Sequence, residues 1–315
     1  MRATLGVRGW TALGIVYVVW GSTYLAIRYA VETVPPLLHA GLRFTAAALV
    51  LLVGLALVRG RAALRATPAQ LTTAAVSGLL LLVGGNGLVS IAEQRVDSGL
   101  AALLIACVPL WIVVLRTMLG DRPGLATAGG VLLGFVGVAL IFLPGGDGEA
   151  DLGYALLCVL ASLSWAAGSL LVTRRPVPAD PLLLTGVEML AGGVVLLATS
   201  AAAGELSGFS LGAVSGRSWL AVGYLVVFGS LVAFTAYVWL LGNAPVSLVS
   251  TYAYVNPAVA VLLGALIADE RLTGAALAGG LVVLAAVAVV VTAEGRRQRR
   301  AAAELAARDG VKVSA

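Results

Sequence analysis

Ten long apolar runs follow one another along the chain, each close to twenty residues in length. A helix rises 1.5 Å per residue, so about 20 apolar residues cross the roughly 30 Å hydrocarbon core of a bilayer. With 60% apolar and 11% charged residues, the chain cannot present an ordinary solvated surface. We therefore predict an all-α integral membrane protein with ten transmembrane helices, at residues 10–30, 37–58, 71–92, 99–118, 125–143, 152–173, 182–203, 218–240, 246–267 and 273–292.

The chain also contains an internal repeat. The stretch 36–52 returns at 181–197 with eight of 17 residues identical. Further pairs keep nearly the same displacement: Trp20 with Trp165, Pro109 with Pro257, and Gly129-Gly130 with Gly279-Gly280. Because each repeat has five helices, an odd number, the second must enter the membrane from the opposite face. We predict two inverted five-helix repeats, at residues 10–143 and 152–292, followed by a basic cytoplasmic tail at 293–315.

Lys and Arg residues are distributed unevenly over the predicted loops. With the N-terminus inside, 15 of them lie on the inner side and four on the outer side. Short cytoplasmic loops are enriched in Lys and Arg, so both termini are predicted to be cytoplasmic. The first run extends through Trp20 and Tyr24 without a convincing cleavage site, and we expect it to be a retained helix. The basic residues after the last run indicate a solvated tail, and no nucleic-acid partner is expected.

Two opposite charges, Arg43 and Glu188, occupy the same position of the repeat. An ionisable group inside a membrane helix is costly and is therefore a functional candidate. Each lies about seven residues into its helix from opposite faces, which leaves the two roughly 10 Å apart along the membrane normal. We expect separate gating or coupling roles, with Glu93 as the partner of Arg43 and with Glu188 titrating to couple protons to transport. Structural pairing is the alternative.

Candidate substrate-binding residues are polar or aromatic positions within predicted helices. Trp20 and Tyr24 share one face of the first helix, and Trp165 repeats Trp20. Ser247, Ser250, Thr251 and Tyr254 form a polar stripe on the ninth helix. The predicted set is Trp20, Tyr24, Asn86, Trp165, Ser250, Tyr254 and Asn256. The alternatives are an interfacial aromatic belt for the rings, a neighbouring helix as partner for Asn86, and bonds to the helix's own carbonyls for the hydroxyls.

Other features bear on hinges and chemistry. Pro109 and Pro257 lie inside predicted helices, where proline frees a carbonyl and kinks the rod, so each is a hinge candidate or a simple kink. Cys107 and Cys158 stand alone in apolar runs, and neither a disulfide nor a metal site is expected. We expect no cofactor. The sequence has one histidine and none of the residue clusters that an intramembrane enzyme needs, so no enzyme activity is expected.

The chain resembles the drug/metabolite transporter superfamily, in particular the ten-helix exporters with two EamA domains, of the RhaT/EamA-like kind. The residues that carry the resemblance are Val19-Trp20-Gly21-Ser22-Thr23-Tyr24, Arg43-Phe44, Ala92-Glu93-Gln94, Ser98-Gly99-Leu100-Ala101-Ala102-Leu103-Leu104, Asn256-Pro257 and Asp269-Glu270-Arg271-Leu272-Thr273. The resemblance implies a bacterial inner-membrane exporter of small metabolites such as amino acids, with a central cavity between the halves. Glu188 departs from the expected pattern.

The function predicted from these observations is secondary transport across the inner membrane by alternating access. The expected partners are a small-molecule substrate, the lipid bilayer and protons as a coupling ion. Inverted repeats with a site near the midplane are typical of secondary transporters. The alternatives are an importer of a sugar or similar solute, and then a membrane receptor or structural protein.

Overall fold

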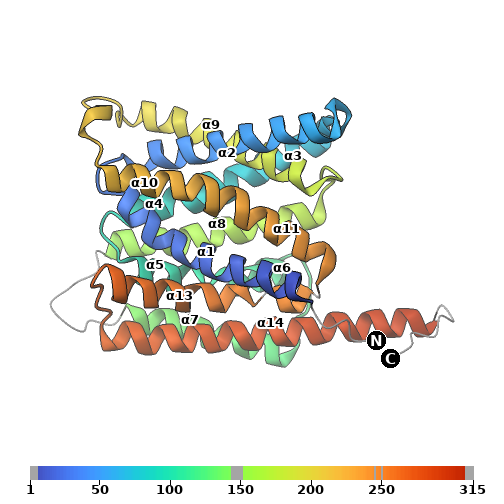
Figure 1. Cartoon of the computed structure of the whole chain (residues 1–315). Helices are drawn as coiled ribbons and strands as arrows, with labels where there is room; N and C mark the ends of the chain where they lie inside the picture. Colours follow the sequence, from blue (N-terminus) through green and yellow to red (C-terminus); the bar gives the residue numbers. More distant parts are fainter. Residues whose placement is uncertain (1–5, 143–151, 245, 250, 309–315) are drawn as a thin grey trace.

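The computed structural model of the chain describes residues 6–142, 152–244, 246–249 and 251–308. All regular elements in these ranges are helical. Eight helical segments are long and apolar enough to cross a membrane, and two apolar helices, Leu125–Ile141 and Tyr252–Ile267, are shorter. Together they give the ten helices predicted from the apolar runs. Figure 1 shows them side by side in one bundle, with α14 running beyond the others.

The first repeat contains five spans, several of them built from more than one element. They are α1 (Val7–Val31), α2 (Pro36–Arg59), then α3 (Pro68–Gly78) with η2 (Leu79–Gly87) and α4 (Leu88–Ala92), then α5 (Ser98–Ile105) with α6 (Val108–Met118), and α7 (Leu125–Ile141). A short 3₁₀ helix, η1 (Arg61–Leu64), follows α2.

The second repeat has the same order of elements. It consists of α8 (Leu152–Arg174), α9 (Pro181–Ala202), then α10 (Gly216–Tyr224) with η4 (Leu225–Val232) and α11 (Ala233–Asn243), then α12 (Val246–Val249) with α13 (Tyr252–Ile267), and α14 (Gly274–Arg308). The 3₁₀ helix η3 (Leu211–Ala213) precedes α10. The basic segment predicted as a solvated tail continues α14 as helix to Arg308.

Local sequence signals set several helix starts. Thr67 and Gln70 form a capping box at the start of α3, and the Asp180 side chain accepts the Leu182 N–H at the start of α9. These side chains satisfy backbone donors that have no partner within the helix. Proline occupies the first helical position of α2, α3 and α9, where its missing N–H costs nothing. Capping side chains and prolines therefore determine where these helices begin, whereas hydrophobicity determines which segments span the membrane.

The two repeats interlock reciprocally. The helix α1 packs against the third and fourth spans of the second repeat, through η4, α11 and α13. In the same way α8 packs against the third and fourth spans of the first repeat, through η2, α4, α5 and α6. The second spans pair as α2 with α9, and the fifth spans pair as α7 with α14. Each repeat thus completes the core of the other.

The third and fourth spans of both repeats are interrupted. The third spans each contain a π-helical segment, η2 and η4, which begin 146 residues apart. The fourth spans are divided between α5 and α6 and between α12 and α13. Pro109 lies at the start of α6, directly after the first division, whereas Pro257 lies inside α13, beyond the second. Wider helical turns of this kind are often found at functional sites, and the apolar pattern did not indicate them.

Candidate functional site

An aromatic cluster lies where α1 meets the second repeat. Trp20 packs against Phe234, Tyr237 and Tyr252, with ring centroids 5.9, 5.0 and 5.3 Å apart. Its indole N–H donates to the carbonyl oxygen of Gly229 in η4 at 3.2 Å. A wide helical turn leaves carbonyls poorly paired along the helix axis, so a side-chain donor can reach one. Trp20 is thus positioned by both its ring neighbours and the π-helical segment.

Trp165 occupies the corresponding place on the other repeat. A Cβ built on Gly85 of η2 would lie 2.8 Å from Cε3 of Trp165, so the ring rests on the glycine. The neighbouring Ser164 hydroxyl donates to the Leu80 carbonyl oxygen of η2 at 2.7 Å. The first helix of each repeat therefore carries a tryptophan onto the π-helical segment of the opposite repeat.

Arg43 is buried in α2 and points at η4. Its Nε–H donates to the Ser230 hydroxyl at 2.9 Å, and its guanidinium carbon lies 4.6 Å from the Phe44 ring centroid. Its Nη2 is 3.2 Å from the position that a Cβ on Gly229 would take, so the glycine makes room for the guanidinium. The predicted contact with Glu93 is not among the ion pairs of the described residues. The side chain is directed toward η4 instead, where Ser230 offers a hydrogen-bond acceptor.

Glu188 is buried in α9 and bonds to a different span. Its Oε1 accepts the Ser77 hydroxyl of α3 at 2.7 Å. Its backbone lies against Gly78, where an added Cβ would meet the Glu188 carbonyl oxygen at 2.3 Å. Arg43 and Glu188 thus contact the third spans of opposite repeats, each from the equivalent position of its own repeat.

Glu93 and Asn256 are buried without satisfying their polar atoms. Glu93 directly follows α4, is 3% exposed, and neither of its carboxylate oxygens has a hydrogen-bond partner in the described residues. The charges that act on it are those of Arg28, Arg43 and Glu270. The Oδ1 atom of Asn256 likewise has no partner in the described part of the chain. Buried polar atoms are normally paired, so both residues are candidates for contact with a bound molecule.

The remaining predicted residues are distributed over the same interface. Tyr24 packs against two clusters of buried hydrophobic residues, and Tyr254 packs against one of these two clusters. Asn86 is half-buried in η2, where its backbone carbonyl oxygen accepts the Ser90 hydroxyl. Thr251 contacts Tyr17 through their hydroxyl groups. Ser250 lies outside the described residues.

Sequence reasoning missed an ion cluster around Glu270 at the end of the bundle where α1 ends. Arg28 pairs with Asp97 and, at 3.3 Å, with Glu270. Glu270 also accepts the backbone N–H groups of Ser98 and Gly99 and the Ser98 hydroxyl, each at 3.0 Å. The carboxylate therefore caps α5 from the loop after α13. The Asp-Glu-Arg motif was visible in the sequence, but its partner on α5 was not.

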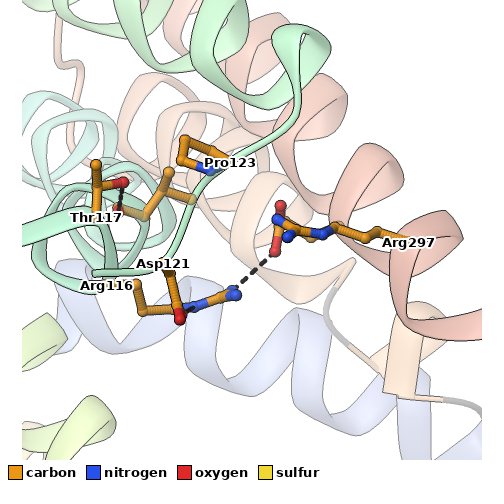
Figure 2. Close-up of a pocket in the computed structure, with 7 residues that line it drawn as sticks. Arg116, Thr117, Asp121, Pro123 and Arg297 are labelled. Carbon is orange, nitrogen blue, oxygen red and sulfur yellow. Dashed lines mark hydrogen bonds and ion pairs between the residues drawn. The ribbon is translucent and has the colours of Figure 1, made fainter. Parts of the chain in front are cut away.

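The opposite end of the bundle carries a second ion cluster (Figure 2). Arg116 contacts Asp121 and Glu294, both at 2.8 Å, and Arg174 contacts Asp121 at 3.4 Å. The Arg116 hydrogen bond holds the pKa of the Asp121 carboxyl below its usual range. The cluster lines a cavity of about 10 Å³. That volume is close to one water molecule, so this cavity does not take a metabolite.

Asp121 and Glu270 are counterparts in the repeat. Asp121-Arg122 and Glu270-Arg271 are displaced by 149 residues, between the 148 of the proline pair and the 150 of the glycine pairs. Their surroundings differ, because the Glu270 side chain is 3% exposed and that of Asp121 is 42% exposed. The Glu270 carboxylate is therefore enclosed by protein at its end of the bundle, whereas the Asp121 carboxylate at the other end is partly solvated.

Comparisons with known proteins extend over nearly the whole chain. The model of the EamA-like transporter family matches residues 8–143 and 152–292. The uncharacterized inner membrane transporter YedA of Escherichia coli K12 is 42% identical over 274 residues, covering 86% of this chain and 87% of that protein. Protein PecM of Dickeya dadantii is 30% identical, covering 83% and 84%. A solved structure with 22% identity has a TM-score of 0.60 over 95% of this chain and 99% of its own, and shares the fold.

Proposed function

This chain belongs to the EamA-like transporter family, and on that premise we propose that it exports a small amphipathic metabolite with a zwitterionic head, such as an amino acid with an apolar side chain. It is a membrane transporter of the drug/metabolite transporter superfamily. The proposal concerns its substrate class, its direction and the residues that bind the substrate. Transport would proceed across the inner membrane, with both termini in the cytoplasm, by alternating access between the two repeats.

One observation carries the substrate class: a buried cation and an aromatic cluster meet on adjacent residues of η4. Trp20 bonds to Gly229, and Arg43 bonds to Ser230. Aromatic rings offer large apolar faces with a polar edge. A guanidinium binds a carboxylate through parallel N–H donors. Together the two groups match an amphipathic molecule that has one carboxylate and an apolar side chain.

The buried charges argue against a more highly charged substrate. Arg43 is the one arginine among the buried charged residues in the described part of the chain. A phosphate or nucleotide sugar would need several such donors to replace its water. Glu93 and Asn256, with oxygens that have no partner, offer acceptors for an ammonium group. A single cation with separate acceptors fits a zwitterion.

The remaining predicted residues take roles consistent with this site. Trp165, Asn86, Tyr24, Tyr254 and Ser250 are proposed to line the path between the repeats. Pro109 and Pro257 are proposed as hinges. The break between α5 and α6 directly before Pro109 supports that role for Pro109, because interrupted helices absorb bending, and Pro257 lies inside α13, where proline kinks a helix.

Glu188 is proposed to act separately from Arg43, because Ser77 and Ser230, their partners, belong to opposite repeats. A double-mutant cycle of Arg43→Ala and Glu188→Gln, scored by transport rate, should give additive losses within about 0.5 kcal/mol. Strong coupling would mean that the two groups touch during transport, and this assignment would fail.

Efflux from reconstituted vesicles tests the function. Vesicles with protein inserted in both orientations are preloaded with radiolabelled amino acids, and efflux is followed with and without a pH gradient. We expect efflux of apolar amino acids, a large loss in Arg43→Gln, and normal rates in the control Arg59→Gln. Arg59 is a suitable control because its side chain is 56% exposed, at the end of α2 away from Ser230. Movement of phosphorylated sugars with no movement of any amino acid would refute the proposal.

A further inference from the structure

Glu93 differs from the other buried carboxylates that the structure describes. Glu188 accepts a hydrogen bond from Ser77, and Glu270 accepts three hydrogen bonds at the start of α5. Glu93 is as buried as these, yet neither of its oxygens has a hydrogen-bond partner of normal geometry in the described residues; the nearest backbone donor is that of Arg28, which acts on the carboxylate but falls short of that geometry. It is also absent from the ion pairs of that part of the chain. An arrangement of this kind requires an explanation, because buried polar groups are normally satisfied.

The neighbouring cations are held by other groups. Arg28 contacts Asp97 and Glu270, and Arg43 bonds to Ser230. The titratable groups that interact electrostatically with Glu93 are Tyr24 and Arg28 from α1, Arg43 from α2, Cys158 from α8, and Glu270 from the loop after α13. A buried ionised carboxylate with no well-formed hydrogen bond and no contacting cation from the protein is strongly unfavourable. Binding a proton removes that charge.

The surroundings favour a proton over a metal ion. Sodium, calcium or magnesium would need about six oxygen ligands arranged around the ion. Among the titratable groups that interact electrostatically with Glu93, Tyr24 and Glu270 carry oxygen, and Glu270 already uses its oxygens at α5. No group of three or more His, Cys, Asp or Glu side chains placed to hold a metal ion occurs in the described residues. A single carboxylate is sufficient to bind a hydrogen ion.

We propose that Glu93 is a proton-binding site, that it carries its proton in the conformation described above, and that transport is coupled to proton movement through it. In the other conformation the O–H bond of the carboxylic acid breaks and the proton passes to water at the end of the bundle that is then open. The carboxylate left behind is stabilised by water or by the ammonium group of the substrate. The coupling part of this inference rests on the proposed function, whereas proton binding at Glu93 does not.

Infrared difference spectroscopy tests proton binding without any substrate. Purified full-length protein is compared in light and heavy water, in the carbonyl-stretch region of protonated carboxylic acids. We expect Glu93→Gln to lose one component of this signal and to keep the thermal stability of the parent, because glutamine has the shape of the neutral acid. Glu205→Gln is the control. Glu205 accepts the Leu37 and Leu38 N–H groups and the Ser200 hydroxyl, so both of its oxygens have protein donors, unlike those of Glu93, and its replacement should leave the signal unchanged.

An unchanged carboxylic-acid signal in Glu93→Gln would overturn the inference. A large loss of thermal stability in that variant would also count against it, because it would show an ionised carboxylate with essential partners. Coupling is tested separately in vesicles with an imposed pH gradient. There Glu93→Gln should remove the dependence of efflux on the gradient, while Glu205→Gln keeps it. If no amino acid moves in the parent protein, the proposed function fails, and the infrared result still decides the proton site.

Discussion

Replacing Glu270 by alanine should reveal how firmly the buried ion cluster around Glu270 holds its end of the bundle. The substitution removes the acceptor of the Ser98 and Gly99 N–H groups and of the Ser98 hydroxyl, and it removes one partner of Arg28. Losing a helix cap costs about 0.5–2 kcal/mol, and a hydrogen bond to a charged group contributes about 1.5–3 kcal/mol. These contributions overlap. Removing one member of a buried pair costs about 3–5 kcal/mol in total. Because Asp97 still pairs with Arg28 in the variant, we expect a loss of stability near the lower end of that range.

The inverted repeat supplies a matched control for this variant. Asp121 is the counterpart of Glu270, but its side chain is 42% exposed and its contacts are screened by solvent. Thermal unfolding of the purified protein in detergent should therefore show a drop of roughly 6 °C for Glu270→Ala, at about 2 °C per kcal/mol, and a much smaller drop for Asp121→Ala. Glu270→Gln, which keeps one acceptor oxygen, should fall between. Equal drops for the two alanine variants would refute the reasoning that burial makes the two ends unequal.

Three further predictions concern packing, orientation and pH. Gly85→Leu should abolish transport and lower thermal stability, because any side chain there collides with the Trp165 ring; normal activity would show that the ring moves freely. A cysteine at Leu211 should react with an impermeant thiol reagent in intact cells and one at Arg61 should not, since the excess of basic residues predicts that residue 61 is cytoplasmic; the reverse pattern would invert the topology. Asp121→Asn should lower thermal stability at neutral pH, and the difference should disappear as acid protonates the parent carboxyl, because a carboxyl with a lowered pKa stabilises the fold only while it is ionised; a difference that persists in acid would assign the effect to shape.

The number and placement of the helices followed from the sequence because the bilayer imposes a length. A run of about 20 apolar residues has few alternatives to a spanning helix. The repeat at 36–52 and 181–197 indicates a duplication. Because each copy has five crossings, an odd number, the two copies must be inverted relative to each other. The same alignment identified Arg43 and Glu188 as equivalent positions, and the structure shows that each contacts the third span of the opposite repeat.

The partners of the buried polar groups were decided by the tertiary structure. From the sequence we expected Arg43 to pair with Glu93, but Arg43 bonds to Ser230 in the π-helical segment η4. The neighbouring Gly229 has no side chain and so leaves room for the guanidinium. The capping of α5 by Glu270 joins residues 172 positions apart. Such contacts depend on the rotation and register of packed helices, and in a membrane nearly every face of a helix is apolar, so the hydrophobic period that orients a soluble helix carries little information. Hydrophobicity is encoded locally along the chain, whereas the partner of a buried carboxylate depends on how the helices pack.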